Sequence, residues 1–122
     1  MPIFAVAFET ARNNLGTAYT EKGMLDEAIA EYKKALDLNP RYVKAHYNLG
    51  VAYLRAGRLD EAIASYRRVI SINPDYAEAH YNLGIAYGKT GKFEEAVKEY
   101  KRALEINPRY TSARANLAVT YI

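Results

Sequence analysis

The stretch Ala45–Pro74, AHYNLGVAYLRAGRLDEAIASYRRVISINP, decides the fold of this 122-residue chain. It recurs nearly in full at Ala79–Pro108, as AHYNLGIAYGKTGKFEEAVKEYKRALEINP, and more loosely at Ala11–Pro40, as ARNNLGTAYTEKGMLDEAIAEYKKALDLNP. The three copies close on prolines at positions 40, 74 and 108, a spacing of 34 residues. Self-similarity at this period predicts a solenoid of stacked helical units.

Each copy contains two helix-like segments, and the local stop signals agree with that division. A glycine follows each first segment, where it can adopt the left-handed conformation that closes a helix. These glycines are Gly23, Gly57 and Gly91. An asparagine precedes each closing proline and should end the second helix, because proline disfavours helical backbone in the residue before it. We predict a first helix over residues 2–22 and second helices that begin at the capping acids Asp26, Asp60 and Glu94.

A further glycine lies inside each first helix, although glycine there costs about 1 kcal/mol relative to alanine. These positions are Gly16, Gly50 and Gly84. We expect close approach of the second helix of the same copy to offset the cost. The small residues predicted opposite them are Ala28, Ala62 and Ala96.

The pattern resembles the tetratricopeptide repeat (TPR) family over residues 9–122. Its signature residues fall in the second copy at Leu49, Gly50, Tyr53, Ala62, Tyr66, Val69 and Pro74. The resemblance implies an all-α fold, a right-handed α-solenoid in one domain, 1–122. Its repeats would be 9–42, 43–76 and 77–110, and residues 111–122 would form a helix that caps the solenoid or begins a truncated fourth repeat. The chain departs from the family where an aromatic residue is usual, and has Arg12, His46, His80 and Arg114.

Composition excludes several classes of function. The net charge of +3 is small and evenly spread, which makes nucleic acid an unlikely partner. The absence of cysteine excludes disulfides and thiolate chemistry. No apolar run reaches the ~20 residues that span a membrane, and the first residues lack the basic region of a signal peptide. By default we expect a cytoplasmic protein that does not insert into membranes.

The resemblance implies that first helices line a concave groove, and this groove is the predicted site. One asparagine per repeat forms a ladder whose amides can bond a peptide backbone, similar to the ladder in the TPR region of the O-linked N-acetylglucosamine transferase. This asparagine ladder consists of Asn14, Asn48, Asn82 and Asn116. The apolar floor around it is Tyr47, Tyr81, Val51 and Ile85. Three cations of the groove, Lys44, Arg55 and Lys89, are also predicted to bind the peptide, and further positions predicted to be exposed there include Asn13, Thr17 and Glu78. The asparagines could alternatively serve only to tie one repeat to the next.

Other ligands fit the sequence less well. The carboxylate clamp by which some TPR domains hold acidic chaperone tails needs lysine, arginine and asparagine at five groove positions. Here these positions hold Asn13, Thr17, Asn48, Glu78 and Asn82, of which only Asn48 fits.

The remaining candidate chemistry favours no catalysis and no bound metal or cofactor. The two histidines lack the three or four converging ligands of a zinc site, so we expect them to pack as the family's aromatic residue does. Outward-facing cation pairs, such as Lys33-Lys34, alternate with acids at helical spacing, which favours ion pairs over a nucleic-acid surface. We find no nucleophile–base arrangement, phosphate loop or HExxH motif, and therefore predict a protein that is not an enzyme.

We therefore predict a non-catalytic scaffold that binds an extended peptide or protein segment in the groove. Two alternatives stay open: a module that self-assembles through its ends, or an accessory fragment of a larger enzyme or complex. The apolar residues at the two ends are Ile3, Phe4, Val6, Phe8, Leu117, Ala118 and Tyr121. Because the repeats differ at about half of their positions, natural divergence is favoured over a design of identical units.

Overall fold

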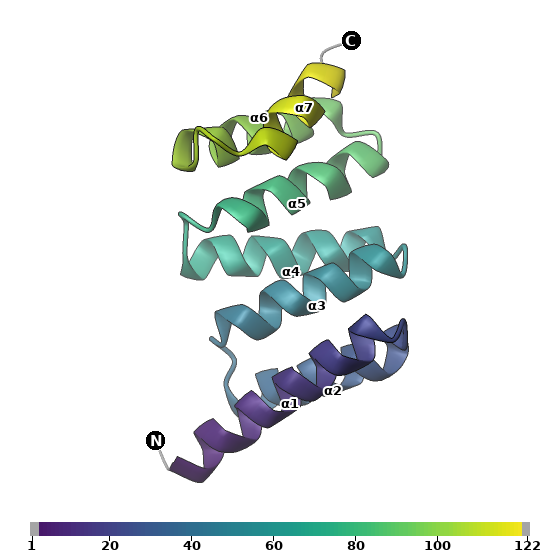
Figure 1. Ribbon diagram of the computed structural model, residues 1–122, viewed down its shortest axis with the longest axis vertical. Coiled ribbons are helices and arrows are strands. Elements are labelled where there is room, and N and C mark those ends of the chain that lie inside the picture. The colour runs from purple at the N-terminus through teal and green to yellow at the C-terminus, as the bar shows by residue number, and fades with distance from the viewer. Residues whose placement is uncertain (1–2, 121–122) are drawn as a thin grey trace.

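The structure is a computed structural model that describes the backbone of residues 3–120 and the side chains of residues 6–120. Within these limits the chain folds into seven α-helices. They are α1 (Ile3–Glu21), α2 (Leu25–Leu38), α3 (Val43–Arg55), α4 (Leu59–Ile72), α5 (Ala77–Lys89), α6 (Phe93–Ile106) and α7 (Thr111–Thr120). The helices stack in chain order, so that α1 and α7 lie at opposite ends (Figure 1). The predicted solenoid of three helical hairpins and a terminal helix is confirmed.

Glycine closes the first helix of each hairpin, as predicted. Gly23, Gly57 and Gly91 have φ values of +76°, +76° and +81°. The next residue then donates back into the last turn, as in the bond of 2.9 Å from the Arg58 N–H to the Tyr53 carbonyl. This is the Schellman arrangement, and only glycine adopts the required conformation without steric cost.

The second helices begin one residue earlier than predicted. They start at Leu25, Leu59 and Phe93, and the residues before them make no side-chain capping bond. Asp26, Asp60 and Glu94 are therefore not caps. They lie in the first turn, where a negative charge still interacts favourably with the helix dipole. The predicted stops are correct, since Asn39, Asn73 and Asn107 are extended.

The glycines inside the first helices contact a tyrosine of the same hairpin, which corrects the prediction of an alanine. A Cβ added at Gly50 would lie 2.7 Å from Cε1 of Tyr66, and one at Gly84 would lie 2.6 Å from Cε1 of Tyr100. Gly16 meets Tyr32 in the same way, at 2.5 Å. The hairpins close on these rings, which are almost fully buried. Each glycine is needed because any side chain would overlap the ring.

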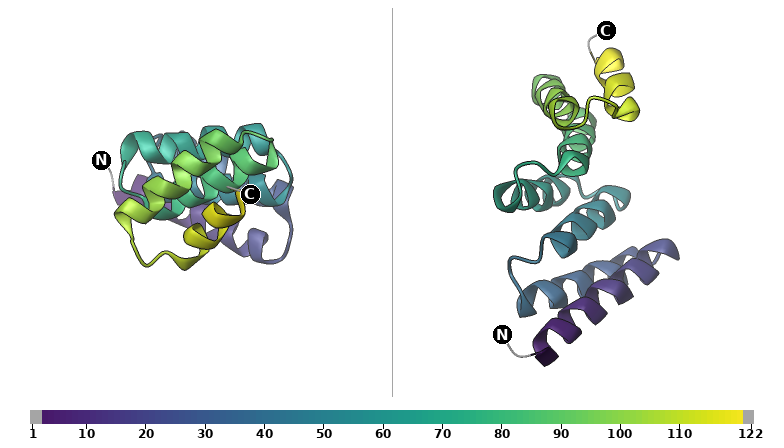
Figure 2. Two further views of the ribbon diagram at one scale, coloured as in Figure 1. Left: turned by 90° about the horizontal axis from the view of Figure 1, so that it is seen from above. Right: turned by 60° about the vertical axis from the view of Figure 1, so that its left-hand side comes forward.

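The first helices lie on the inner side of the stack. Among the described residues, α1 contacts α3 and α3 contacts α5, whereas α2, α4 and α6 make no comparable contacts with one another. The right-hand view of Figure 2 shows the same succession of hairpins from a further side. Helices on the inside of a curved stack come closer together than those outside. The side chains between α1, α3, α5 and α7 therefore form the surface on which the predicted site must lie.

Candidate functional site

The asparagine ladder joins neighbouring hairpins on this inner face. The Asn48 amide donates to Oδ1 of Asn13 over 3.1 Å, and the Asn82 amide donates to the Tyr47 hydroxyl over 3.0 Å. Asn116 repeats the second contact with Tyr81 at 3.3 Å. Each amide therefore ties its helix to the first helix of the preceding hairpin. An amide has a second N–H and an oxygen, so these bonds do not use its full capacity.

The first hairpin departs from this arrangement, and one predicted position there is wrong. Asn13 was predicted to be exposed but is only 2% exposed, because the Asn48 amide packs over it. Asn14, the ladder residue of α1, is exposed and makes no hydrogen bond in the described part of the chain. It differs from the other three ladder residues because no hairpin precedes it in the described structure.

The predicted floor residues Tyr47 and Tyr81 are half-buried and held by other rings. The Tyr47 ring stacks on Tyr76 with a centroid distance of 5.1 Å and lies 6.0 Å from Tyr66. The Tyr81 ring repeats the arrangement with Tyr110 at 4.9 Å and Tyr100 at 5.9 Å. Burial raises the pKa of the Tyr47 hydroxyl, which therefore stays neutral and able to accept from Asn82. These rings form a rigid floor rather than free side chains.

A hollow of about 290 Å³ lies between α1 and α3 on the inner face. Its lining residues are Thr17, Thr20, Glu21, Tyr32, Tyr47, Asn48, Val51 and Arg55. Four predicted site residues, Tyr47, Asn48, Val51 and Arg55, thus meet in one place. The other predicted cations, Lys44 and Lys89, are exposed outside it, and Ile85 is half-buried further along.

Sequence reasoning missed Thr20 in this hollow. Its hydroxyl donates to the Gly16 carbonyl over 2.9 Å and lies 3.1 Å from the Tyr32 hydroxyl. Thr17 also contacts that hydroxyl, at 3.3 Å. The sequence did contain a signal for it. Thr20 has a hydroxyl at a repeat position where the later copies have Leu54 and Gly88, which carry none. The hollow is therefore more polar at the first hairpin than at the later ones.

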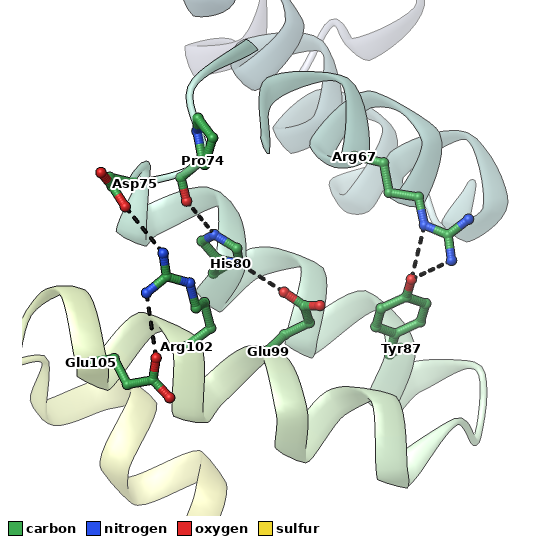
Figure 3. Close-up of polar contacts among 8 residues, drawn as sticks. All are labelled: Arg67, Pro74, Asp75, His80, Tyr87, Glu99, Arg102 and Glu105. Carbon is green, nitrogen blue, oxygen red and sulfur yellow. Dashed lines mark hydrogen bonds and ion pairs between the residues drawn. The ribbon is translucent and has the colours of Figure 1, made fainter. Parts of the chain in front are cut away.

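A second group of polar contacts lies where α4, α5 and α6 meet (Figure 3). The His80 ring lies 2.7 Å from Oε1 of Glu99 through Nδ1 and 2.8 Å from the Pro74 carbonyl through Nε2. The Arg67 guanidinium donates to the Tyr87 hydroxyl at 2.9 and 2.6 Å. The hollow beside them, of about 350 Å³, is lined by Arg67, Ile70, His80, Leu83, Tyr87, Glu95, Lys98 and Glu99.

Three of the four positions that lack the family's aromatic residue, His46, His80 and Arg114, have a shared role that the sequence did not reveal. His46 and His80 lie 2.8 Å from the carbonyls of Pro40 and Pro74, and Arg114 donates to the Pro108 carbonyl over 2.7 Å. These side chains hold the loop that precedes their helix. The prediction that the histidines only pack as an aromatic residue would is therefore incomplete.

Ion pairs account for part of the outer cations. Lys34 pairs with Glu31 at 3.4 Å, and Arg102 pairs with Asp75 at 3.1 Å and with Glu105 at 3.4 Å. Among the described residues, no group of three or more histidines and acids is placed to hold a metal ion. Within the same residues, each helix is too short or too polar to cross a bilayer.

Two protein-family models match the repeats of this chain. A family model described as TPR repeat matches residues 16–57 and 52–91, and a model described as Tetratricopeptide repeat matches residues 77–110. No curated protein matches the sequence.

Three solved structures show the likeness of the fold. The first TPR of Spaghetti (RPAP3), bound to the HSP90 peptide SRMEEVD, is 29% identical with a TM-score of 0.92, over 94% of this chain and 91% of that one. YrrB, described as a TPR protein with an unusual peptide-binding site, is 26% identical with a TM-score of 0.85, over 88% and 56%. The Thermobaculum terrenum O-GlcNAc transferase is 25% identical with a TM-score of 0.89, over 98% of this chain but only 23% of that enzyme.

The family models together extend from residue 16 to residue 110, which is most of the chain. The internal repeat, the glycine–tyrosine contacts and the stacked hairpins agree with them. This chain belongs to the tetratricopeptide repeat family.

Proposed function

We propose that the protein is a non-catalytic scaffold that binds an extended peptide segment on its inner face. The observation that carries the proposal is the hollow between α1 and α3, where Asn48 and Arg55 stand beside the hydroxyls of Thr17 and Thr20. An amide and hydroxyls can bond a peptide backbone, and the exposed guanidinium adds attraction for an acidic side chain. A peptide is bound to one similar structure, and another is described as having a peptide-binding site, which supports peptide recognition by this chain.

The proposed ligand is an internal segment rather than a chain terminus. A terminal carboxylate needs several convergent cations, and the equivalent positions here include the buried Asn13 and the exposed acid Glu78. Glu78 would repel such a terminus. Lys44 and Lys89 instead lie spread along α3 and α5. This spacing suits a segment with separated acidic side chains, lying along Asn48, Asn82 and Asn116.

The test begins with panning the full chain against a phage library of random linear 12-residue peptides. A selected peptide would be synthesised with both ends blocked, and its Kd measured by calorimetry for two variants. Arg55→Ala removes a cation of the inner hollow, whereas Lys98→Ala removes an exposed cation of the outer hollow. Because a charge-assisted bond is worth about 1.4 kcal/mol or more, Arg55→Ala should weaken binding about tenfold. Lys98→Ala should leave the Kd unchanged.

The ladder has its own test. Asn48→Ala combined with Asn82→Ala should weaken the same peptide while circular dichroism shows unchanged helicity. Because both amides also bond the preceding hairpin, the binding would be measured well below the melting temperature of the variant. Equal peptide affinities for the wild type, the Arg55 variant and the ladder variant would refute the inner face as the site.

A further inference from the structure

The helices at the two ends of the solenoid are alike in sequence. Residues 8–19, FETARNNLGTAY, and residues 110–121, YTSARANLAVTY, are three repeat lengths apart. They share five identical residues, namely Ala11/Ala113, Arg12/Arg114, Asn14/Asn116, Leu15/Leu117 and Tyr19/Tyr121. Three of these pairs, Ala11/Ala113, Asn14/Asn116 and Leu15/Leu117, lie at positions whose α7 members pack on the hairpin before it.

The contacts of α7 show what this packing requires. Ala113 is fully buried, and the Asn116 amide donates to the Tyr81 hydroxyl over 3.3 Å. Tyr110, just before α7, packs its ring on Tyr81 at 4.9 Å. α1 contains the same alanine and asparagine, and it has Phe8 where α7 is preceded by Tyr110. It could therefore make the same contacts with α6 and Tyr81.

The corresponding face of α1 is open. Leu15 is 40% exposed, whereas the equivalent Leu49 and Leu83 are 6% and 2% exposed. Phe8 is 60% exposed. Asn14 is exposed without the hydrogen bond that the other ladder residues make. This face is thus built for the second helix of another hairpin, as α3, α5 and α7 receive α2, α4 and α6.

Within the chain itself α7 packs on α6, and α7 buries little of its own surface there. Ala113 is the single buried residue among the side chains of α7. Val119 is 71% exposed, and no described second helix covers α7. α1, in contrast, carries α2 against its other side, with Gly16 packed on the Tyr32 ring. α1 has 19 residues and α7 has 10 in the described structure, so the longer helix offers more surface to α6.

We propose that copies of this chain associate head to tail, with α1 of one copy on α6 of the next in the place of α7. Phe8, Asn14 and Leu15 then take the positions of Tyr110, Asn116 and Leu117. The contact continues the packing already repeated inside the chain at α2–α3 and α4–α5. Because it joins two different surfaces, it leads to open series of copies rather than to a closed dimer.

The experiment compares mass against concentration, by light scattering behind size exclusion, for the full chain, a shortened chain and point variants of them. A chain lacking residues 110–122 exposes α6 and should form a growing series of species at concentrations where the full chain is mostly monomeric. Leu15→Glu, in either background, should weaken association at least about tenfold, because it places a charge in the apolar contact. Thr10→Glu is the matched control, since Thr10 and its equivalents Lys44, Glu78 and Ser112 are exposed.

The same series contains the outcomes that overturn the proposal. A second copy could instead dock beside α7, on the hollow of about 300 Å³ lined by Phe93, Glu94, Val97 and Thr120. In that case removal of residues 110–122 would weaken association instead of strengthening it. A shortened chain that is helical and monomeric at every concentration would also exclude the exchange. If the shortened chain does not fold, equal association of the Leu15→Glu and Thr10→Glu full chains gives the same negative answer.

Discussion

The second and third hairpins contain the same histidine in different surroundings. His46 and His80 both lie 2.8 Å from the carbonyl of the proline that precedes their helix. The His80 ring also meets Glu99, but the equivalent position in the second hairpin is Ser65. One substitution therefore separates a ring with two acceptors from a ring with one.

The difference decides the charge of each ring. Burial by itself lowers the pKa of His80, but the hydrogen bonds to Glu99 and Pro74 outweigh it and raise the pKa above the ordinary 6.5. Since a carbonyl and a carboxylate only accept, both nitrogens of His80 must donate, and the ring is an imidazolium. Burial lowers the pKa of His46, and the charge of Arg68 lowers it further. Together they outweigh the hydrogen bond to the Pro40 carbonyl, which raises the pKa. A shared backbone position thus holds a charge in one hairpin and a neutral ring in the other.

The largest expected effect concerns the glycine–tyrosine contact that both hairpins contain. Gly50→Ala and Gly84→Ala each place a Cβ within 2.7 Å of a tyrosine ring, so each should lower the free energy of unfolding by ~1–3 kcal/mol. Gly88→Ala is the control on the same helix, because a Cβ there meets nothing within 4 Å. It should raise stability by up to ~1 kcal/mol. Urea unfolding of the three variants checks this, and equal effects at Gly84 and Gly88 would contradict it.

The next effect comes from removing the partner of the charged ring. Glu99→Gln should destabilise the protein by ~1–2 kcal/mol, because the buried imidazolium loses its carboxylate. The same unfolding measurement applied to Glu105→Gln serves as control, since that acid is exposed and pairs with Arg102 at 3.4 Å. The control should change stability by less than ~0.5 kcal/mol. A Glu99 variant as stable as this control would show that the histidine pair is not needed.

The pH dependence of the two hairpins should have opposite sign. The stabilising contribution of His80 is complete below pH 6.5 and is lost as the pH rises through its raised pKa. His46 has a lowered pKa, so its contribution is present above pH 6.5 and is lost as the pH falls through that pKa. Because the chain has only two histidines, ring NMR signals titrate each one separately. A His80 signal that titrates below that of His46 would reverse the assignment.

The comparison can be sharpened by moving the acid. Ser65→Glu gives His46 the partner that His80 has, beside a hollow of about 290 Å³ that also borders Arg68. We expect the pKa of His46 to rise, as followed by NMR, while that of His80 stays unchanged. Ser65→Gln is the neutral control of similar size. A rise with glutamine as large as that with glutamate would mean that charge is not the cause.

The smallest effect concerns the tyrosine hydroxyls. The Tyr66 hydroxyl is buried without a hydrogen-bond partner, whereas that of Tyr32 contacts Thr17 and Thr20. Tyr66→Phe should therefore be neutral or slightly stabilising, and Tyr32→Phe should cost ~1 kcal/mol. Melting curves of the two variants test the difference. Equal losses would show that the Tyr66 hydroxyl has a partner after all.

The sequence by itself determined the helices and where they end. Gly57 closes α3 and Asn73 ends α4 because the conformations of glycine and of the residue before proline depend on the chain next to them. The repeat added the order of the hairpins, because each unit can bury its apolar face only against its neighbours. Four groove residues predicted on α3, namely Tyr47, Asn48, Val51 and Arg55, also line one hollow.

Only the tertiary structure decided which side chains meet between helices. It buried Asn13 under Asn48, placed Tyr66 rather than Ala62 against Gly50, and gave His80 its acceptors. It also left the face of α1 around Leu15 open. Apart from the contact of His80 with Pro74, these contacts join residues that are 16 to 35 positions apart in the chain, such as Gly50 with Tyr66 and Asn13 with Asn48. They depend on the rotation and distance of packed helices, which local sequence does not set, because both come from the close packing of the whole stack.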